Sequence, residues 1–155
     1  MVARHLEACA AIRRERGIGE ALAGTLLTLA ALRRQAGGTK EARQLLDEAA
    51  ALNGADGPAS LRVRLAIERA LLDGGSGARE AKDLLVRHHD RLGARDAMVA
   101  WFDLWTLSRD PADLREAKRL LDRLVDRAPP ERREPMRRNV RLHREIESAW
   151  AARPS

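Results

Sequence analysis

Apolar residues recur every three or four positions along most of this chain, the spacing that places them on one face of an α-helix. Residues 41–46, Glu-Ala-Arg-Gln-Leu-Leu, show the pattern clearly, because Ala42, Leu45 and Leu46 share one face and polar residues occupy the rest. The strict alternation that predicts β-strands does not occur, and the apolar residues are mostly Leu, Ala, Val and Ile. The pattern therefore predicts an all-α protein.

Two further versions of this hexapeptide follow along the chain. Glu-Ala-Lys-Asp-Leu-Leu begins at Glu80, 39 residues after the first copy, and Glu-Ala-Lys-Arg-Leu-Leu begins at Glu116, another 36 residues later. A near-constant period of this length is typical of proteins built by stacking one repeated unit. Each copy follows a break that contains Gly or Pro, and a longer apolar segment precedes that break. The unit is therefore predicted to be a helix-turn-helix hairpin.

These breaks divide the chain into about eight helices, which we expect to form a single domain over residues 1–155. The expected fold is an α-solenoid of about three hairpins, at residues 20–53, 59–92 and 94–128, with an additional helix at each end, at residues 2–16 and 131–152. Asp110 and Pro111 should begin the helix of the third copy, because aspartate caps a helix and proline is tolerated in its first turn. Residues 21–32 are apolar nearly all round, which predicts the most buried helix.

The arrangement resembles the tetratricopeptide repeat family, whose unit is a helical hairpin of 34 residues. The first copy matches the family pattern on both helices and at the turn, with Gly54 in place of the closing Pro, through Leu26, Leu29, Ala30, Gly37, Ala42, Leu46 and Ala49. The third copy matches through Trp101, Leu104, Ala117, Leu121, Leu124 and the closing Pro129, although Trp105 is large where the family has a small residue. The second copy has a longer turn and matches loosely, through Val63, Ala66, Ala81 and Leu85. The resemblance covers roughly residues 23–131.

Similarity to this family implies a non-enzymatic protein-protein interaction module, or adaptor, that binds its partner in a concave groove lined by the first helices of successive hairpins. The residues beside the packing positions of those helices are the candidate groove residues: Arg34, Arg64, Glu68, Phe102, Thr106 and Arg109. Several Arg in such a groove would suit an acidic peptide or a C-terminal carboxylate, because a guanidinium pairs with a carboxylate through two hydrogen bonds. The alternative is that these Arg are ordinary surface residues.

The sequence leaves the partner open. A separate protein or peptide is one possibility, and another part of a larger parent chain is the other. Ala8 precedes Ala42 by 34 residues, so the first helix fits the second half of an earlier repeat. On that interpretation the chain is a piece of a longer array.

The charge of the chain suggests a second class of function. The formal net charge is +6, and 26 of the 29 basic residues are Arg, a composition typical of a GC-rich bacterial genome. The densest basic cluster contains Arg132, Arg133, Arg137, Arg138, Arg141 and Arg144. An RNA- or DNA-binding helical repeat that uses its Arg-rich faces is therefore the alternative. Most of the arginines of the chain, however, have an acidic residue three or four positions away, as on a solvated helix face.

The sequence offers little catalytic or metal-binding chemistry. His5 and Cys9 lie one helical turn apart, but two ligands do not close a tetrahedral site. Residues 74–77 are rich in Gly but lack the Lys that follows in a phosphate-binding loop. Trp101 and Trp105 lie one turn apart, where they would either stack on a ligand or, as we expect, fill the space between hairpins. We predict a protein without enzymatic activity, cofactor or metal.

Three features of the sequence predict a cytoplasmic protein. Cys9 is the only cysteine, so no internal disulfide can form and a reducing compartment fits. The first residues are charged, unlike those of a signal peptide. The apolar run at residues 21–32 is too short to cross a bilayer, so we expect no membrane partner.

Overall fold

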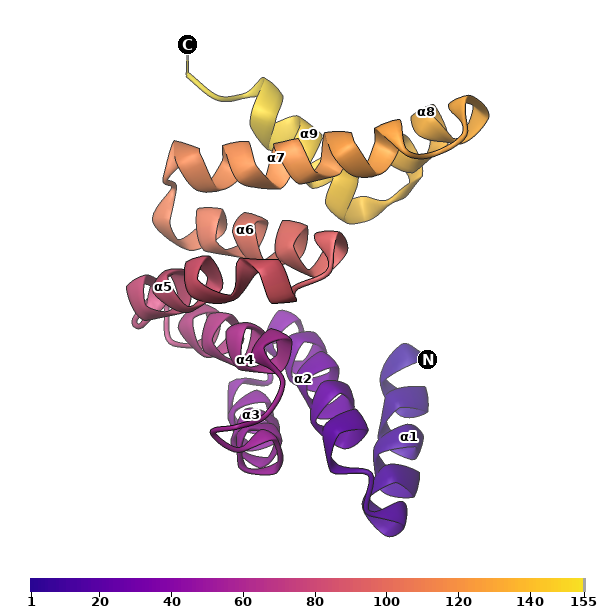
Figure 1. Ribbon diagram of the computed structural model, residues 1–155. Helices are drawn as coiled ribbons and strands as arrows, with labels where there is room; N and C mark the ends of the chain where they lie inside the picture. The colour runs from indigo at the N-terminus through magenta and orange to yellow at the C-terminus, as the bar shows by residue number, and fades with distance from the viewer. Residues whose placement is uncertain (155) are drawn as a thin grey trace. The chain divides into compact units, whose positions relative to one another are not determined.

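The computed structural model describes residues 1–154, and within them the backbone is helical with no β-strand, which confirms the all-α prediction. Nine α-helices lie in this range, one more than expected. They are α1 (Val2–Arg16), α2 (Gly19–Gln35), α3 (Thr39–Asn53), α4 (Ala59–Leu72), α5 (Ala78–His88), α6 (Ala94–Ser108), α7 (Pro111–Asp126), α8 (Pro130–Asn139) and α9 (Arg141–Ala151), with a short 3₁₀ turn, η1 (His89–Arg91), after α5 (Figure 1). The chain divides into two compact units, Met1–Leu84 and Leu85–Ser155.

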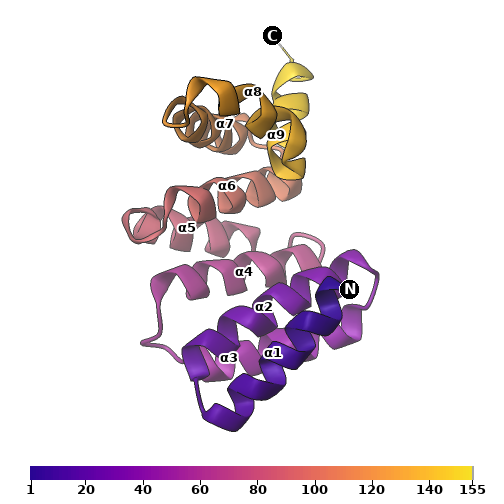
Figure 2. The ribbon, with the colours of Figure 1, turned by 90° about the vertical axis from the view of Figure 1, so that its right-hand side faces the viewer.

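The first unit is built around α2. This helix contacts α1, α3 and α4, which is why its sequence is apolar nearly all round (Figure 2). Its largest buried side chains, Leu26 and Leu27, have no exposed surface and pack in one cluster with Ala10 of α1, Leu46 of α3 and Leu61 of α4. Seven of the 17 residues of α2 and six of the 14 residues of α4 are buried, so the deep burial predicted for α2 is shared with α4 and α2 alone is not the most buried helix.

The second unit is built on the α6–α7 hairpin, against which the C-terminal helices pack. Met98 and Phe102 of α6, Leu121 of α7 and Ile146 of α9 form its core, and α9 crosses α7 obliquely (Figure 1). The start of α7 is as predicted, because the Asp110 carboxylate accepts a hydrogen bond of 2.9 Å from the backbone N–H of Ala112.

The C-terminal segment corrects the prediction of one closing helix over residues 131–152. The helix is broken at Val140, whose backbone is extended, with φ −88° and ψ 119°. Pro135 lies inside α8 and cannot donate a backbone hydrogen bond, which weakens the helix before the break. The break turns α9 back onto α7, so that Ile146 is fully buried. Burying a side chain of this size stabilises the fold by about 1.5–3 kcal/mol, which offsets the interrupted helix.

The repeated hexapeptide marks the residues at which helices meet. Its Ala and its second Leu are buried in the first copy, as Ala42 and Leu46, and in the third copy, as Ala117 and Leu121. A small Ala lets two helix backbones approach closely, and the Leu one turn later fills the space beside it. The motif therefore recurs for a packing reason.

Candidate functional site

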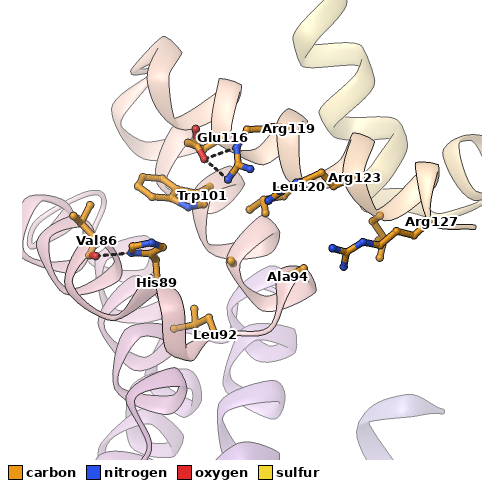
Figure 3. Close-up of a pocket in the computed structure, with 12 residues that line it drawn as sticks. Val86, His89, Leu92, Ala94, Trp101, Glu116, Arg119, Leu120, Arg123 and Arg127 are labelled. Atoms are coloured by element: carbon orange, nitrogen blue, oxygen red, sulfur yellow. Dashed lines mark hydrogen bonds and ion pairs between the residues drawn. The ribbon is translucent and has the colours of Figure 1, made fainter.

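The second unit contains an open pocket of about 480 Å³. It lies where the end of α5 and η1 meet the first half of α6 and the second half of α7 (Figure 3). Its walls are formed by Val86, His89, Leu92, Ala94, Ala97, Trp101, Glu116, Arg119, Leu120, Arg123, Leu124 and Arg127. A pocket of this volume is within the range that binds small molecules or a few side chains of a partner protein.

The floor of the pocket is apolar. Ala94, Ala97 and Trp101 follow one face of α6 at helical spacing, and Leu120 and Leu124 lie one turn apart on α7. The two Ala side chains are too short to fill the space between the helices, which leaves the hollow open. Trp101 packs against the core of the unit and also forms part of the pocket wall. It thus fills space, as expected, and still presents a surface to the pocket.

One rim of the pocket is a row of arginines. Arg119 and Arg123 lie one turn apart on α7, Arg127 follows one turn later as the residue directly after the helix, and all three are exposed. The guanidinium of Arg119 donates to the Glu116 carboxylate, with an Nε–Oε2 distance of 3.0 Å (Figure 3). Within residues 1–154 the side chains of Arg123 and Arg127 make no hydrogen bond or ion pair. Two cations beside an apolar floor are therefore left available for an anionic ligand.

The remaining polar group of the pocket is His89. Its Nδ1 lies 3.0 Å from the carbonyl oxygen of Val86, and its Nε2 lies 2.8 Å from the Asp90 carboxylate. Among the residues that the structure describes, the lining contains no Ser, Thr, Cys or Lys side chain, and its one carboxylate, Glu116, is paired with Arg119. The chemistry of the pocket is therefore cationic and apolar contact, and the lining supplies no hydroxyl, thiol or amine nucleophile.

None of the six groove residues expected from the sequence lines this pocket, and two of them pair with each other. Arg34 of α2 donates from Nε to Oε2 of Glu68 on α4 over 3.0 Å, with the side chains only 25% and 12% exposed. Arg64, also on α4, is partly buried and makes no ion pair within residues 1–154. The opposite charges of Arg34 and Glu68 therefore neutralise each other and do not face a ligand together.

The other three expected groove residues lie on α6 or directly after it. Phe102 is only 6% exposed and belongs to the core, and the Thr106 hydroxyl donates to the carbonyl oxygen of Asp103 over 2.6 Å. Arg109 caps α6 in the left-handed region, at φ 57°, and its guanidinium lies 4.5 Å from the centre of the Trp105 ring. Trp105 in turn stacks on Phe102 with 5.4 Å between the ring centres. The three residues stabilise the end of α6.

The arginine row on α7 was missed because a regular series of charges is typical of a solvated helix face. A usable signal was present in the sequence. Arg119, Arg123 and Arg127 recur at four-residue spacing beside the apolar series of Leu120 and Leu124. All three residues of this series are positively charged, whereas a face stabilised by ion pairs carries both charges. Of the three, Arg119 has an acidic residue of α7 bonded to it in the described structure.

The denser basic cluster at residues 132–144 has a different environment. Arg133 donates to the carbonyl oxygens of Asp126 and Ala128, both over 3.0 Å, and thereby caps the end of α7. The remaining contacts of the cluster are Arg137 with Asp122 and Glu147, Arg138 with Glu134, Arg141 with Glu145, and Arg144 with the carbonyl oxygen of Arg138. Most of this charge is therefore satisfied within the unit.

An ion network behind the pocket joins α7 to the two C-terminal helices. Burial raises the pKa of Asp122, but hydrogen bonds from Lys118 at 2.6 Å and Arg137 at 2.9 Å outweigh burial and hold that pKa below its ordinary value. For Arg137 the effects are reversed. Burial lowers the pKa of Arg137, but its bonds to Asp122 and Glu147 outweigh burial and hold that pKa above its ordinary value. The network fixes the helix that carries the arginine row.

Comparison with known proteins adds no assignment: no protein family, no curated protein and no solved structure matches the chain. Within residues 1–154 no three His, Cys, Asp or Glu side chains lie close enough together to hold a metal ion. Over the same range, every helix is too short or too polar to cross a membrane. The geometry of the pocket therefore carries the functional argument.

Proposed function

We propose that this chain is a non-enzymatic interaction module that binds an acidic, partly apolar segment of a partner protein at the α7 pocket. The observation that carries this proposal is the presence of Arg123 and Arg127, both without a partner in the described structure, on the rim of an open apolar hollow. Its setting is a stack of helical hairpins similar to tetratricopeptide repeats, in the cytoplasm. The stack of hairpins is supported by the repeated hexapeptide and by the burial of its Ala and its second Leu. The cytoplasmic location is supported by the single cysteine, Cys9.

The two parts of the pocket provide different contributions to binding. The apolar floor gains about 25 cal/mol for each Å² of apolar surface that a ligand removes from water. The arginines add specificity for carboxylates, because a guanidinium can donate two parallel hydrogen bonds to one carboxylate. Exposed ion pairs contribute only about 0.2–1 kcal/mol each, so we expect an affinity in the micromolar range.

The alternative function, binding of RNA or DNA, is favoured by one observation. Trp101 lies beside the arginine row, and an aromatic ring beside guanidinium groups suits a stacked base with its phosphate. The densest basic cluster gives it less support, because its arginines mostly bond to acidic side chains and carbonyl oxygens of the same unit. We therefore place protein binding first.

Fluorescence polarisation tests the proposal. The whole chain is titrated into a fluorescein-labelled pool of short peptides that contain Leu, Ala, Glu and Asp in random order, into a pool in which Lys replaces the acids, and into single-stranded RNA of random sequence. We expect the acidic pool to bind and the basic pool not to bind. The double variant Arg123→Glu/Arg127→Glu should weaken binding of the acidic pool by about tenfold or more, equivalent to about 1.4 kcal/mol.

The matched control is Arg95→Glu/Arg115→Glu, which makes the same change of charge at two exposed arginines of α6 and α7 that do not line the pocket. It should stay within about twofold of the wild type, since neither side chain lines the pocket and exposed charges outside it are screened by salt. An equal loss in both double variants would show binding by net charge alone and would refute the pocket. Tight RNA binding that weakens steeply with salt would establish the alternative.

A further inference from the structure

We infer that the segment bound at the α7 pocket is an α-helix, with an apolar stripe flanked by two carboxylates one turn apart. This inference rests on the proposed function, because it specifies the partner of the same site. The other occupants that the surface must be tested against are an extended peptide, a second copy of this chain and a nucleic acid.

The polar backbone groups of a bound segment must keep hydrogen-bond partners inside the pocket. An extended peptide exposes N–H and C=O groups that need hydrogen-bond partners when they are taken out of water. The pocket walls come mostly from helices, whose backbone groups are bonded internally, and the lining contains no Ser, Thr, Asn or Gln. A helical ligand satisfies its own backbone and needs only side-chain contacts. The pocket therefore suits a helix.

The two arginines repeat at the interval of a helix. Arg123 lies in the last turn of α7 and Arg127 directly follows the helix with a right-handed helical backbone, which places them about 6 Å apart along the helix axis at a rise of about 1.5 Å per residue. A ligand helix aligned with α7 repeats its own side chains at the same interval, so carboxylates at positions i and i+4 can face both guanidinium groups. Figure 3 shows the side chain of Arg127 extending toward Ala94, over the floor that the apolar stripe would cover.

The unpaired charge is unevenly distributed along the rim. Glu116 neutralises Arg119 at one end of the row, while Arg123 and Arg127 at the other end have no bonded partner in the described range. A ligand therefore needs two carboxylates, one for Arg123 and one for Arg127, to pair with the remaining charge of the rim. The small side chains of Ala94 and Ala97 leave room for the ligand helix to approach α6 closely.

Selection from an unbiased library tests the inference. The whole chain is used to select from displayed random peptides of about 16 residues, long enough to form a helix on binding, and the pool is depleted on the Arg123→Glu/Arg127→Glu variant. We expect the selected sequences to carry Asp or Glu at positions i and i+4, next to apolar residues at helical spacing. Replacing the central residue of a selected peptide by Pro should weaken its binding by about tenfold or more, since Pro breaks a helix.

Each outcome of this experiment has a defined meaning. Acids that alternate at positions i and i+2, together with tolerance of the central Pro, would overturn the helical ligand and leave the proposed function intact. Failure to enrich any sequence that depends on Arg123 and Arg127 would overturn both. A peptide with both acids changed to Lys should bind the double variant more tightly than the wild type, and absence of this reversal would remove the arginine row from the site.

The double variant must remain folded for these results to count. Both substitutions lie at exposed positions, so the circular dichroism spectrum and the tryptophan fluorescence should match those of the wild type. Selection on the Arg95→Glu/Arg115→Glu control should return the same peptides as the wild type. Different peptides from the control would mean that total charge, and not the pocket, selects the ligand.

Discussion

The hairpins α2–α3 and α6–α7 carry the same motif and the same interior, yet present different surfaces. Ala42 and Leu46 in the first hairpin are buried as deeply as Ala117 and Leu121 in the second, each pair at the same two positions of the hexapeptide. The outer positions differ. Glu48 in the first copy corresponds to Arg123 in the third, seven residues after the first residue of each hexapeptide.

The positions of Arg119, Arg123 and Arg127 are occupied by Gln44, Glu48 and Leu52 in the first copy, and these differences change what the helix surface can do. The guanidinium of Arg14 on α1 donates to the Glu48 carboxylate from Nε and Nη2, both over 2.7 Å, and holds the pKa of Glu48 below its ordinary value. Other ion pairs also join the helices of the first unit, namely Arg33 with Glu7, Arg34 with Glu68, Arg43 with Asp73 and Arg69 with Asp47. The comparison teaches that inner positions of the motif determine packing, whereas outer positions determine whether a surface is closed by internal pairs or left for a ligand.

The largest expected effect concerns the interior that the two hairpins share. Leu46→Ala in the first unit and Leu121→Ala in the second should each lower the free energy of unfolding by about 2–5 kcal/mol, because each leaves a cavity at a fully packed position. Urea unfolding measures both. Trp101, Trp105 and Trp150 all belong to the second unit, so fluorescence reports on Leu121→Ala, and circular dichroism reports on Leu46→Ala.

The control for this prediction is Leu52→Ala, at an exposed position of α3. It should change the free energy of unfolding by less than about 1 kcal/mol, since the Leu52 side chain is 40% exposed and water can fill the space that it leaves. If Leu46→Ala were as mild as Leu52→Ala, the hexapeptide would not mark the core.

An exchange of the outer residues tests the difference between the hairpins directly. Arg123→Glu gives the third copy the acid of the first, where it can pair with Arg127, and should weaken binding of the acidic peptide pool by about tenfold. Glu48→Arg makes the reverse change in the first unit and should leave peptide binding unaltered. It should cost about 0.5–1 kcal/mol of stability, because it breaks the bond to Arg14 and places two cations together. Weakened peptide binding by Glu48→Arg would place the ligand on the first unit.

The smallest expected effect is the response of the two carboxylates to pH. Asp122 and Glu48 both have a pKa below the ordinary value, so each stabilises the folded state above its ordinary pKa of 3.8 or 4.5. This contribution is lost as the pH falls through the lowered folded value. Asp122→Asn should cost about 1 kcal/mol at neutral pH and Glu48→Gln about 0.5 kcal/mol, because Asp122 has two cationic partners and Glu48 has one.

Urea midpoints measured at neutral pH and at successively lower pH check these values, since the carboxylates are charged at neutral pH and take up protons as the pH falls. The difference between each variant and the wild type should shrink on acidification. A difference that stayed constant with pH would mean that the charge of the carboxylate does not stabilise the fold. A larger effect for Glu48→Gln than for Asp122→Asn would contradict the role of the network behind the pocket.

Much of the fold follows from local pattern, and the exceptions have identifiable causes. Helix starts such as Asp110 and buried positions such as Leu46 were predictable, because capping and helical periodicity involve residues close in sequence. The break at Val140 was not, because it depends on the burial of Ile146 against a separate helix. The pocket was not predictable either, since its hollow arises where the short Ala94 and Ala97 meet α7.

The sequence by itself determined that this protein is helical, that one packing motif is used three times, and which faces of the helices are apolar. Only the tertiary structure decided which arginines are paired. Arg14 and Glu48 are 34 residues apart in sequence, as are Arg34 and Glu68, and each pair meets because two helices pack. Helical periodicity is a short-range property of the chain, whereas the partner of a surface charge depends on the helix placed beside it. Arg123 and Arg127 are available to a ligand because, within residues 1–154, their side chains form no hydrogen bond or ion pair with the helices packed around them.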